Sequence, residues 1–180
     1  MSEQPAGTSP RPDTDEKISH VMAYTLSGIY WGELITKTII RVSTWLRTNA
    51  VPDRITLYNA KGMITTGGQV SPTSYAELHI PLSQIQAFHL IPPEQDPIDY
   101  DPTEPNRKME PVLVLLGSFQ FKGFLRLSTT SNVKKFLEVT HELYTPVYDA
   151  EITNLLLPNL GNIRVPYVLV RQETAIFARR

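Results

Sequence analysis

The chain has 180 residues, 41% of them hydrophobic, and its 17 Lys and Arg nearly balance its 18 Asp and Glu to give a formal net charge of −1. This length suits one ordinary domain or two small ones. The absence of cysteine excludes disulfides and thiolate metal sites, and no apolar run is long enough to cross a bilayer, so we expect a cytoplasmic protein with no membrane partner.

Two segments of the chain are predicted to lie outside the folded parts. Residues 1–18 are polar, rich in proline and without apolar periodicity, so they cannot bury enough surface to offset the entropy lost on ordering. We expect them to form a disordered tail. Residues 92–110 are also rich in proline and carry six acidic side chains, which predicts an extended acidic linker.

Residues 19–91 are predicted to form a compact β unit. A turn at residues 27–28 (Ser-Gly) separates two strand-like runs and is typical of a β-hairpin. Apolar side chains then follow a helical spacing at Val42, Trp45 and Leu46, which predicts a short amphipathic helix. The remaining strands are expected over residues 54–61, 75–81 and 84–90.

The same pattern returns 91 positions later and defines a second unit over residues 111–180. Identical residues recur in the two units: Val21, Ser27, Gly32, Leu34, Thr38, Val42 and Leu46 return as Val112, Ser118, Gly123, Leu125, Thr129, Val133 and Leu137. In the second unit Asn132 is a good candidate to cap the helix. A repeat of this kind indicates two copies of one folding unit.

The predicted fold class is therefore mainly β. We expect two tandem repeats, each a small five-stranded barrel or curled sheet with one short helix between its second and third strands. Copies of this length are near the size at which a single core is marginal, so the two are expected to pack together.

The residues with catalytic potential do not form a recognisable motif. The four histidines are not spaced as metal ligands, no nucleophile elbow or phosphate-binding loop occurs, and no carboxylate recurs at matched positions. We therefore predict a protein that is not an enzyme, with no cofactor, no metal site and no identified small-molecule substrate. An enzyme with a site between the repeats is the least favoured alternative.

The basic residues are the candidate binding residues. Both repeats are mildly basic, with five basic and three acidic side chains in residues 20–90 and eight and five in residues 111–180. The candidates are Arg41, Arg47, Arg54, Lys134, Lys135 and Arg171. Our leading hypothesis is a non-enzymatic binding or scaffolding module that meets a protein partner or itself through exposed strands. The alternative is RNA binding by the basic faces, with aromatic side chains nearby for stacking.

Three short motifs resemble small β-barrels of the Sm-like and SH3-like kind, and uncharacterised bacterial domains with a similar hairpin, helix and closing strand pair. They are residues 30–34 (YWGEL), 55–60 (ITLYNA) and 80–85 (IPLSQI), with echoes at 123–125 (GFL), 147–150 (VYDA) and 168–176 in the second copy. The resemblance implies a tandem small-barrel fold. Sm-like proteins place their helix before the first strand, and their RNA-binding loop residues have no counterpart here. The resemblance therefore does not extend to ring assembly or RNA binding.

Overall fold

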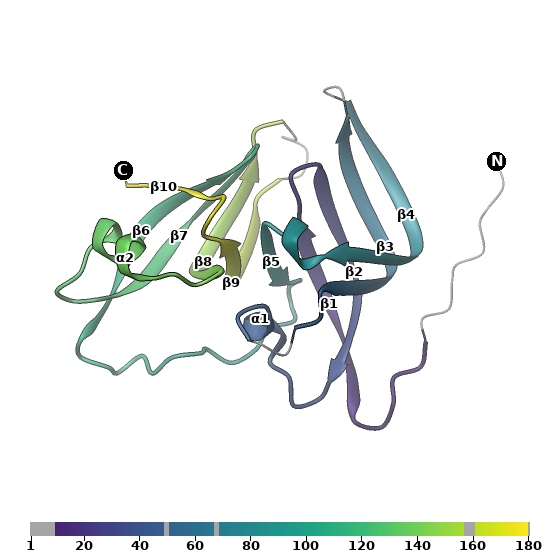
Figure 1. Ribbon diagram of the computed structural model, residues 1–180, viewed down its shortest axis with the longest axis horizontal. Coiled ribbons are helices and arrows are strands. Elements are labelled where there is room, and N and C mark those ends of the chain that lie inside the picture. The colour runs from purple at the N-terminus through teal and green to yellow at the C-terminus, as the bar shows by residue number, and fades with distance from the viewer. Residues whose placement is uncertain (1–9, 49–50, 67–68, 157–160, 180) are drawn as a thin grey trace.

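The computed structural model describes residues 10–48, 51–66, 69–156 and 161–179. In this part of the chain the protein is mainly β, with ten strands in one antiparallel sheet (Figure 1). The first half contains β1 (Glu16–Tyr24), β2 (Gly28–Lys37), β3 (Arg54–Thr66), β4 (Gln69–Pro81) and β5 (Ala87–Leu90). The second half contains β6 (Arg107–Leu116), β7 (Phe119–Ser128), β8 (Tyr144–Asn154), β9 (Ile163–Arg171) and β10 (Ile176–Ala178).

The order of strands in the sheet is the same in both halves. The first five strands lie in the order β5-β1-β2-β3-β4, and the last five in the order β10-β6-β7-β8-β9. The halves are joined because β5 pairs with β9, with Ala87 opposite Val170 and Phe88 opposite Leu169. We expected two small barrels or curled sheets. Across the described residues the strands instead form one continuous open sheet, because the outer side of β5 is taken by β9 and not by β4.

Two glycines, Gly32 in β2 and Gly123 in β7, lie where the pairing with the next strand changes register. Opposite them, Asn59 and Asp149 adopt positive φ angles of 47° and 48°. A Cβ would lie 2.7 Å from a carbonyl oxygen of the neighbouring strand at Gly32, and 2.6 Å from one at Gly123. The close approach of the backbones therefore requires glycine at both bulges.

Among the described residues the hydrophobic core forms two clusters, and each contains residues from both halves. The cluster of the first half includes Tyr144 and Leu169 from the second. The cluster of the second half includes Tyr24, Ile29 and Ala87 from the first. The two halves therefore share their interiors.

The described residues form three short helices between the strands: α1 (Val42–Trp45), the 3₁₀ helix η1 (Leu82–Gln84) and α2 (Val133–Val139). Asn132 caps α2 as predicted, because its side chain accepts a hydrogen bond from the backbone N–H of Lys135 at 2.9 Å. Trp45 is only 6% exposed and belongs to the core of the first half. Within the described ranges, no helix has the length and apolar character needed to span a membrane.

Two strands extend into segments predicted to be unstructured. β1 begins at Glu16, inside the predicted tail of residues 1–18, and β6 begins at Arg107, inside the predicted linker of residues 92–110. In both cases the extra residues continue a ladder with the next strand, which satisfies their backbone groups. Composition did not reveal this pairing. Residues 1–9 of the predicted tail lie outside the described part of the chain.

Candidate functional site

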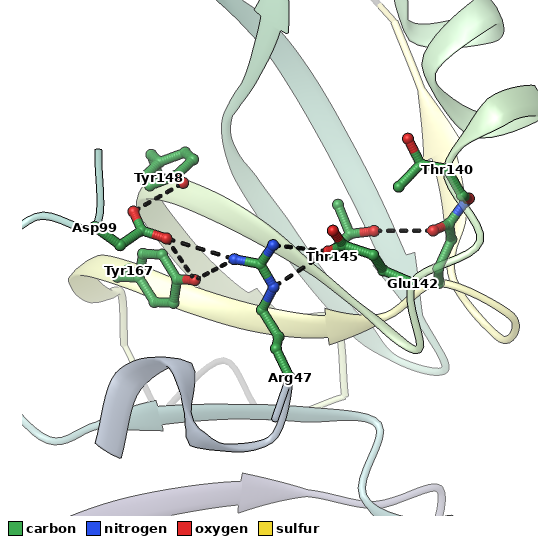
Figure 2. A network of polar contacts seen from close by, with 8 residues as sticks. Arg47, Asp99, Thr140, Glu142, Thr145, Tyr148 and Tyr167 are labelled. Carbon is green, nitrogen blue, oxygen red and sulfur yellow. Dashed lines mark hydrogen bonds and ion pairs between the residues drawn. The ribbon is translucent and has the colours of Figure 1, made fainter. Parts of the chain in front are cut away.

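Arg47 follows α1 and reaches from the first half to the second (Figure 2). Its Nε and Nη2 donate hydrogen bonds to Glu142 Oε2 at 3.1 and 2.8 Å. Its Nη1 donates to Asp99 Oδ2 at 3.5 Å and to Tyr167 Oη at 3.4 Å. The guanidinium of Arg47 thus contacts the linker at Asp99, strand β9 at Tyr167 and the loop before β8 at Glu142.

Asp99 is the linker residue at the centre of this network, and its side chain is 13% exposed. The phenol of Tyr148 donates to Asp99 Oδ1 at 3.0 Å, and that of Tyr167 donates to Oδ2 at 3.3 Å. Burial, followed by the charge of Asp99, raises the pKa of both tyrosines above the ordinary value. Both phenols therefore stay protonated and remain donors, which satisfies a carboxylate that is largely removed from water. We call Arg47, Asp99, Glu142, Tyr148 and Tyr167 the Arg47 network.

The next linker residue, Tyr100, packs against the second half. Its ring meets the ring of Tyr148 edge-on, with centroids 5.1 Å apart, and the guanidinium of Arg126 lies 4.5 Å from its centroid. Arg126 Nη2 also donates to Asp101 O at 3.0 Å and to a carboxylate oxygen of Glu104. These contacts hold the linker against the second half through charge and aromatic packing.

The earlier part of the linker contacts the first half. Asp96 Oδ2 accepts a hydrogen bond from the backbone N–H of Ser43 at 2.7 Å, and Glu94 Oε2 accepts one from the backbone N–H of His20 at 2.9 Å. The acidic linker is therefore a strap that is fixed to both halves by its own carboxylates. The carboxylates that make the linker acidic in the sequence therefore form contacts within the molecule.

A cavity of about 40 Å³ lies between the linker and the sheet. Its lining includes Arg41, Leu90 and Ile98 together with members of the Arg47 network. A space of this size holds one or a few water molecules and is far smaller than a substrate pocket. The Arg47 network therefore acts as a clamp, by which we mean that it joins the first half, the linker and the second half through internal contacts.

The structure places the six predicted binding residues in four parts of the fold. Arg41 and Arg47 flank α1, next to the linker. Lys134 and Lys135 are exposed on α2, where Lys134 Nζ lies 3.8 Å from Glu138 Oε1. Arg54 begins β3, and Arg171 ends β9 with only 13% of its side chain exposed. Arg171 donates to Leu82 O at 3.3 Å, across the junction of the halves. Their role in binding stays a prediction.

Four members of the network were not among the predicted residues: Asp99, Glu142, Tyr148 and Tyr167. The repeat pointed to Tyr148, which holds the place of Tyr58. In the first half Tyr58 pairs with Glu77, whereas in the second half Tyr148 pairs with Tyr167. Tyr167 therefore stands at a position at which the halves differ, and the internal comparison could not identify it.

Two strands have a neighbour on one side only in the described sheet. β4 pairs with β3, and β10 pairs with β6. β10 is short and carries Ile176, which is 63% exposed. β4 is long and carries Pro72 and Pro81. These edges offer backbone donors and acceptors to another strand.

The described residues contain no group of three or more His, Cys, Asp and Glu placed to hold a metal ion. No family model matches the chain, and neither a curated protein nor a solved structure matches it.

Proposed function

We propose that the protein is a non-enzymatic scaffolding module that binds partner proteins through the free edges of its sheet. The observation that carries this proposal is the pair of free edges, β4 and β10, at opposite ends of one continuous sheet. An edge strand binds another chain by continuing the hydrogen-bonded ladder, and its side chains add specificity.

We further propose that the two halves descend from one unit. The shared strand order and the matching glycine bulges support this. Matching tertiary hydrogen bonds support it too: Thr38 N donates to Asp15 O at 2.7 Å, and Thr129 N donates to Asn106 O at 3.0 Å. In such a doubled unit, the junction pairs one edge strand of each copy and leaves the other edge strand of each copy at an end of the described sheet.

The linker strap contributes to this function by fixing the angle between the halves. Because Asp96 and Asp99 contact the first half while Tyr100 packs on the second, the two free edges are held in a constant relation. A scaffold needs such rigidity, since partners bound at its two ends are then positioned relative to each other.

The test compares proteins captured by the wild-type chain with those captured by an edge variant, Ile176→Lys, and by a matched surface variant, Lys134→Ala. We expect the edge variant to lose specific captured proteins that the surface variant retains, because a lysine on an edge opposes strand addition. Equal capture by all three chains would contradict the proposal. Retention of RNA that falls steeply with salt and is lost in Lys134→Ala would favour the nucleic-acid alternative instead.

A further inference from the structure

The strand pairing that joins the two halves also specifies a partner for the free edges. We infer that β10 of one molecule pairs antiparallel with β4 of a second copy, in the register that β5 and β9 use within one chain. This inference rests on the proposed function and names the partner of those edges. It follows from three comparisons of strand register.

The first comparison matches β10 with β5. In the first half, Phe88 of β5 lies opposite Ala23 of β1. In the second half, Phe177 of β10 lies opposite Val114 of β6. Because Ala23 and Val114 occupy the same place in the repeat, 91 positions apart, Phe177 occupies the place of Phe88.

The second comparison matches β4 with β9. Thr56 of β3 lies opposite His79 of β4, and Pro146 of β8 lies opposite Leu169 of β9. Thr56 and Pro146 occupy the same place in the repeat, since residues 57–61 return as residues 147–151. His79 therefore occupies the place of Leu169.

The third comparison transfers the pairing between the strands. Within one chain Phe88 lies opposite Leu169. The same register between two copies places Phe177 of one opposite His79 of the other. Two residues further on, where side chains return to the same face, it places Arg179 opposite Glu77.

The charges at these positions fit this register. Arg179 and Glu77 carry opposite charges, and their side chains are 68% and 55% exposed. Within one chain Arg179 lies 3.4 Å from Glu110 and Glu77 lies 3.5 Å from His79, so the contact between copies adds to these pairs. Directly opposed residues of an antiparallel pair have side chains on one face, so the two form a cross-strand ion pair in the contact. On the other face of the strand, Ile176, which is 63% exposed, lies opposite Ile80, which is 4% exposed, and is covered by the second copy. The edges are thus complementary in charge, and their contact also covers Ile176.

The contact between copies is weaker than the junction within the chain. Arg171 N donates to Gln86 O at 2.7 Å across the internal junction. Pro81 occupies the place of Arg171, and proline has no N–H to donate. The association is therefore reversible and depends on concentration. Because each copy uses unlike edges, every added molecule leaves one β4 and one β10 free, which gives an open head-to-tail chain.

Site-specific crosslinking tests the register, since the chain contains no cysteine. His79→Cys and Phe177→Cys are prepared separately, mixed and oxidised. We expect a disulfide-linked dimer in the mixture and not in either preparation alone, because only the unlike edges meet with the short Cα separation that a disulfide needs. Tyr75→Cys mixed with Phe177→Cys is the control for a shifted register. Equal crosslinking of both mixtures would overturn the inferred register.

A charge exchange tests the contact without cysteine. In light scattering over a concentration series, we expect Arg179→Glu to weaken association several-fold, and Arg179→Glu combined with Glu77→Arg to restore it. A wild-type chain that stays monomeric up to millimolar concentration would overturn the inference of a second copy. If the wild-type chain stayed monomeric but Ile176→Lys abolished capture of another protein, the proposed function would stand and only self-association would be excluded. If the wild-type chain stayed monomeric and Ile176→Lys also left capture unchanged, both the proposed function and the inferred self-association would fail.

Discussion

At the scale of single residues, His89 and Tyr24 form a buried polar pair beside the junction of the halves. His89 Nδ1 donates to Leu90 O at 2.7 Å, so the neutral ring accepts a hydrogen bond at Nε2 from the phenol of Tyr24 at 3.0 Å. Burial lowers the pKa of His89 from 6.5 to about 4. The structure therefore requires this imidazole to be neutral.

We predict a loss of stability in mild acid from this pair. The pKa of His89 is lower in the folded than in the unfolded protein, so the unfolded chain binds the proton first as the pH falls. The free energy of unfolding should thus decrease from pH 6.5 to pH 4, by up to about 3 kcal/mol for this group. Urea unfolding at several pH values measures it. His89→Gln should flatten this part of the profile, and an unchanged profile would contradict the assignment.

We predict that Arg47→Ala destabilises the protein by about 1–3 kcal/mol, because it removes donors from the largely buried Asp99 and from Glu142. Chemical denaturation measures the loss. Lys134→Ala is the matched control, since that lysine is 84% exposed and its ion pair contributes less than about 1 kcal/mol. Equal effects of the two substitutions would exclude the clamp as a stabilising contact.

At the scale of the elements, the bulges of β2 and β7 depend on glycine. We predict that Gly32→Ala and Gly123→Ala each cost about 1–3 kcal/mol, since the added Cβ meets a backbone carbonyl that can move only with its strand. Gly117→Ala is the comparison: its Cβ meets nothing within 4 Å, so only the positive φ of 56° is penalised. Thermal unfolding would show a smaller effect at Gly117 than at the bulges. The reverse order would contradict the steric argument.

The elements also show what the sequence could predict. Strand-like apolar runs located the strands, and the Asn132 cap followed from local chemistry. Two features were not predictable in this way. The pairing of β5 with β9 depends on a contact between strands far apart in the chain, and composition alone gives no register. The docking of Asp99 and Tyr100 depends on Arg47, Tyr148 and Arg126, which the sequence presents as separate charges and aromatics.

At the scale of the whole molecule, the shared cores make the halves interdependent. We predict that residues 105–180 expressed alone do not fold cooperatively, because Tyr24, Ile29 and Ala87 would no longer cover their core. The fragment should bind a hydrophobic dye and lack a sharp thermal transition, and adding residues 1–104 should restore the transition. A fragment that unfolds cooperatively by itself would show that the halves are separate domains.

The two ends of the open sheet are chemically different. One end presents the long strand β4 with Glu77 and His79, and the other presents the short strand β10 with Ile176 and Arg179. Any filament built from such molecules would be polar, with chemically distinct tips. A capping factor that recognised one tip would therefore halt growth there and leave the opposite tip able to elongate.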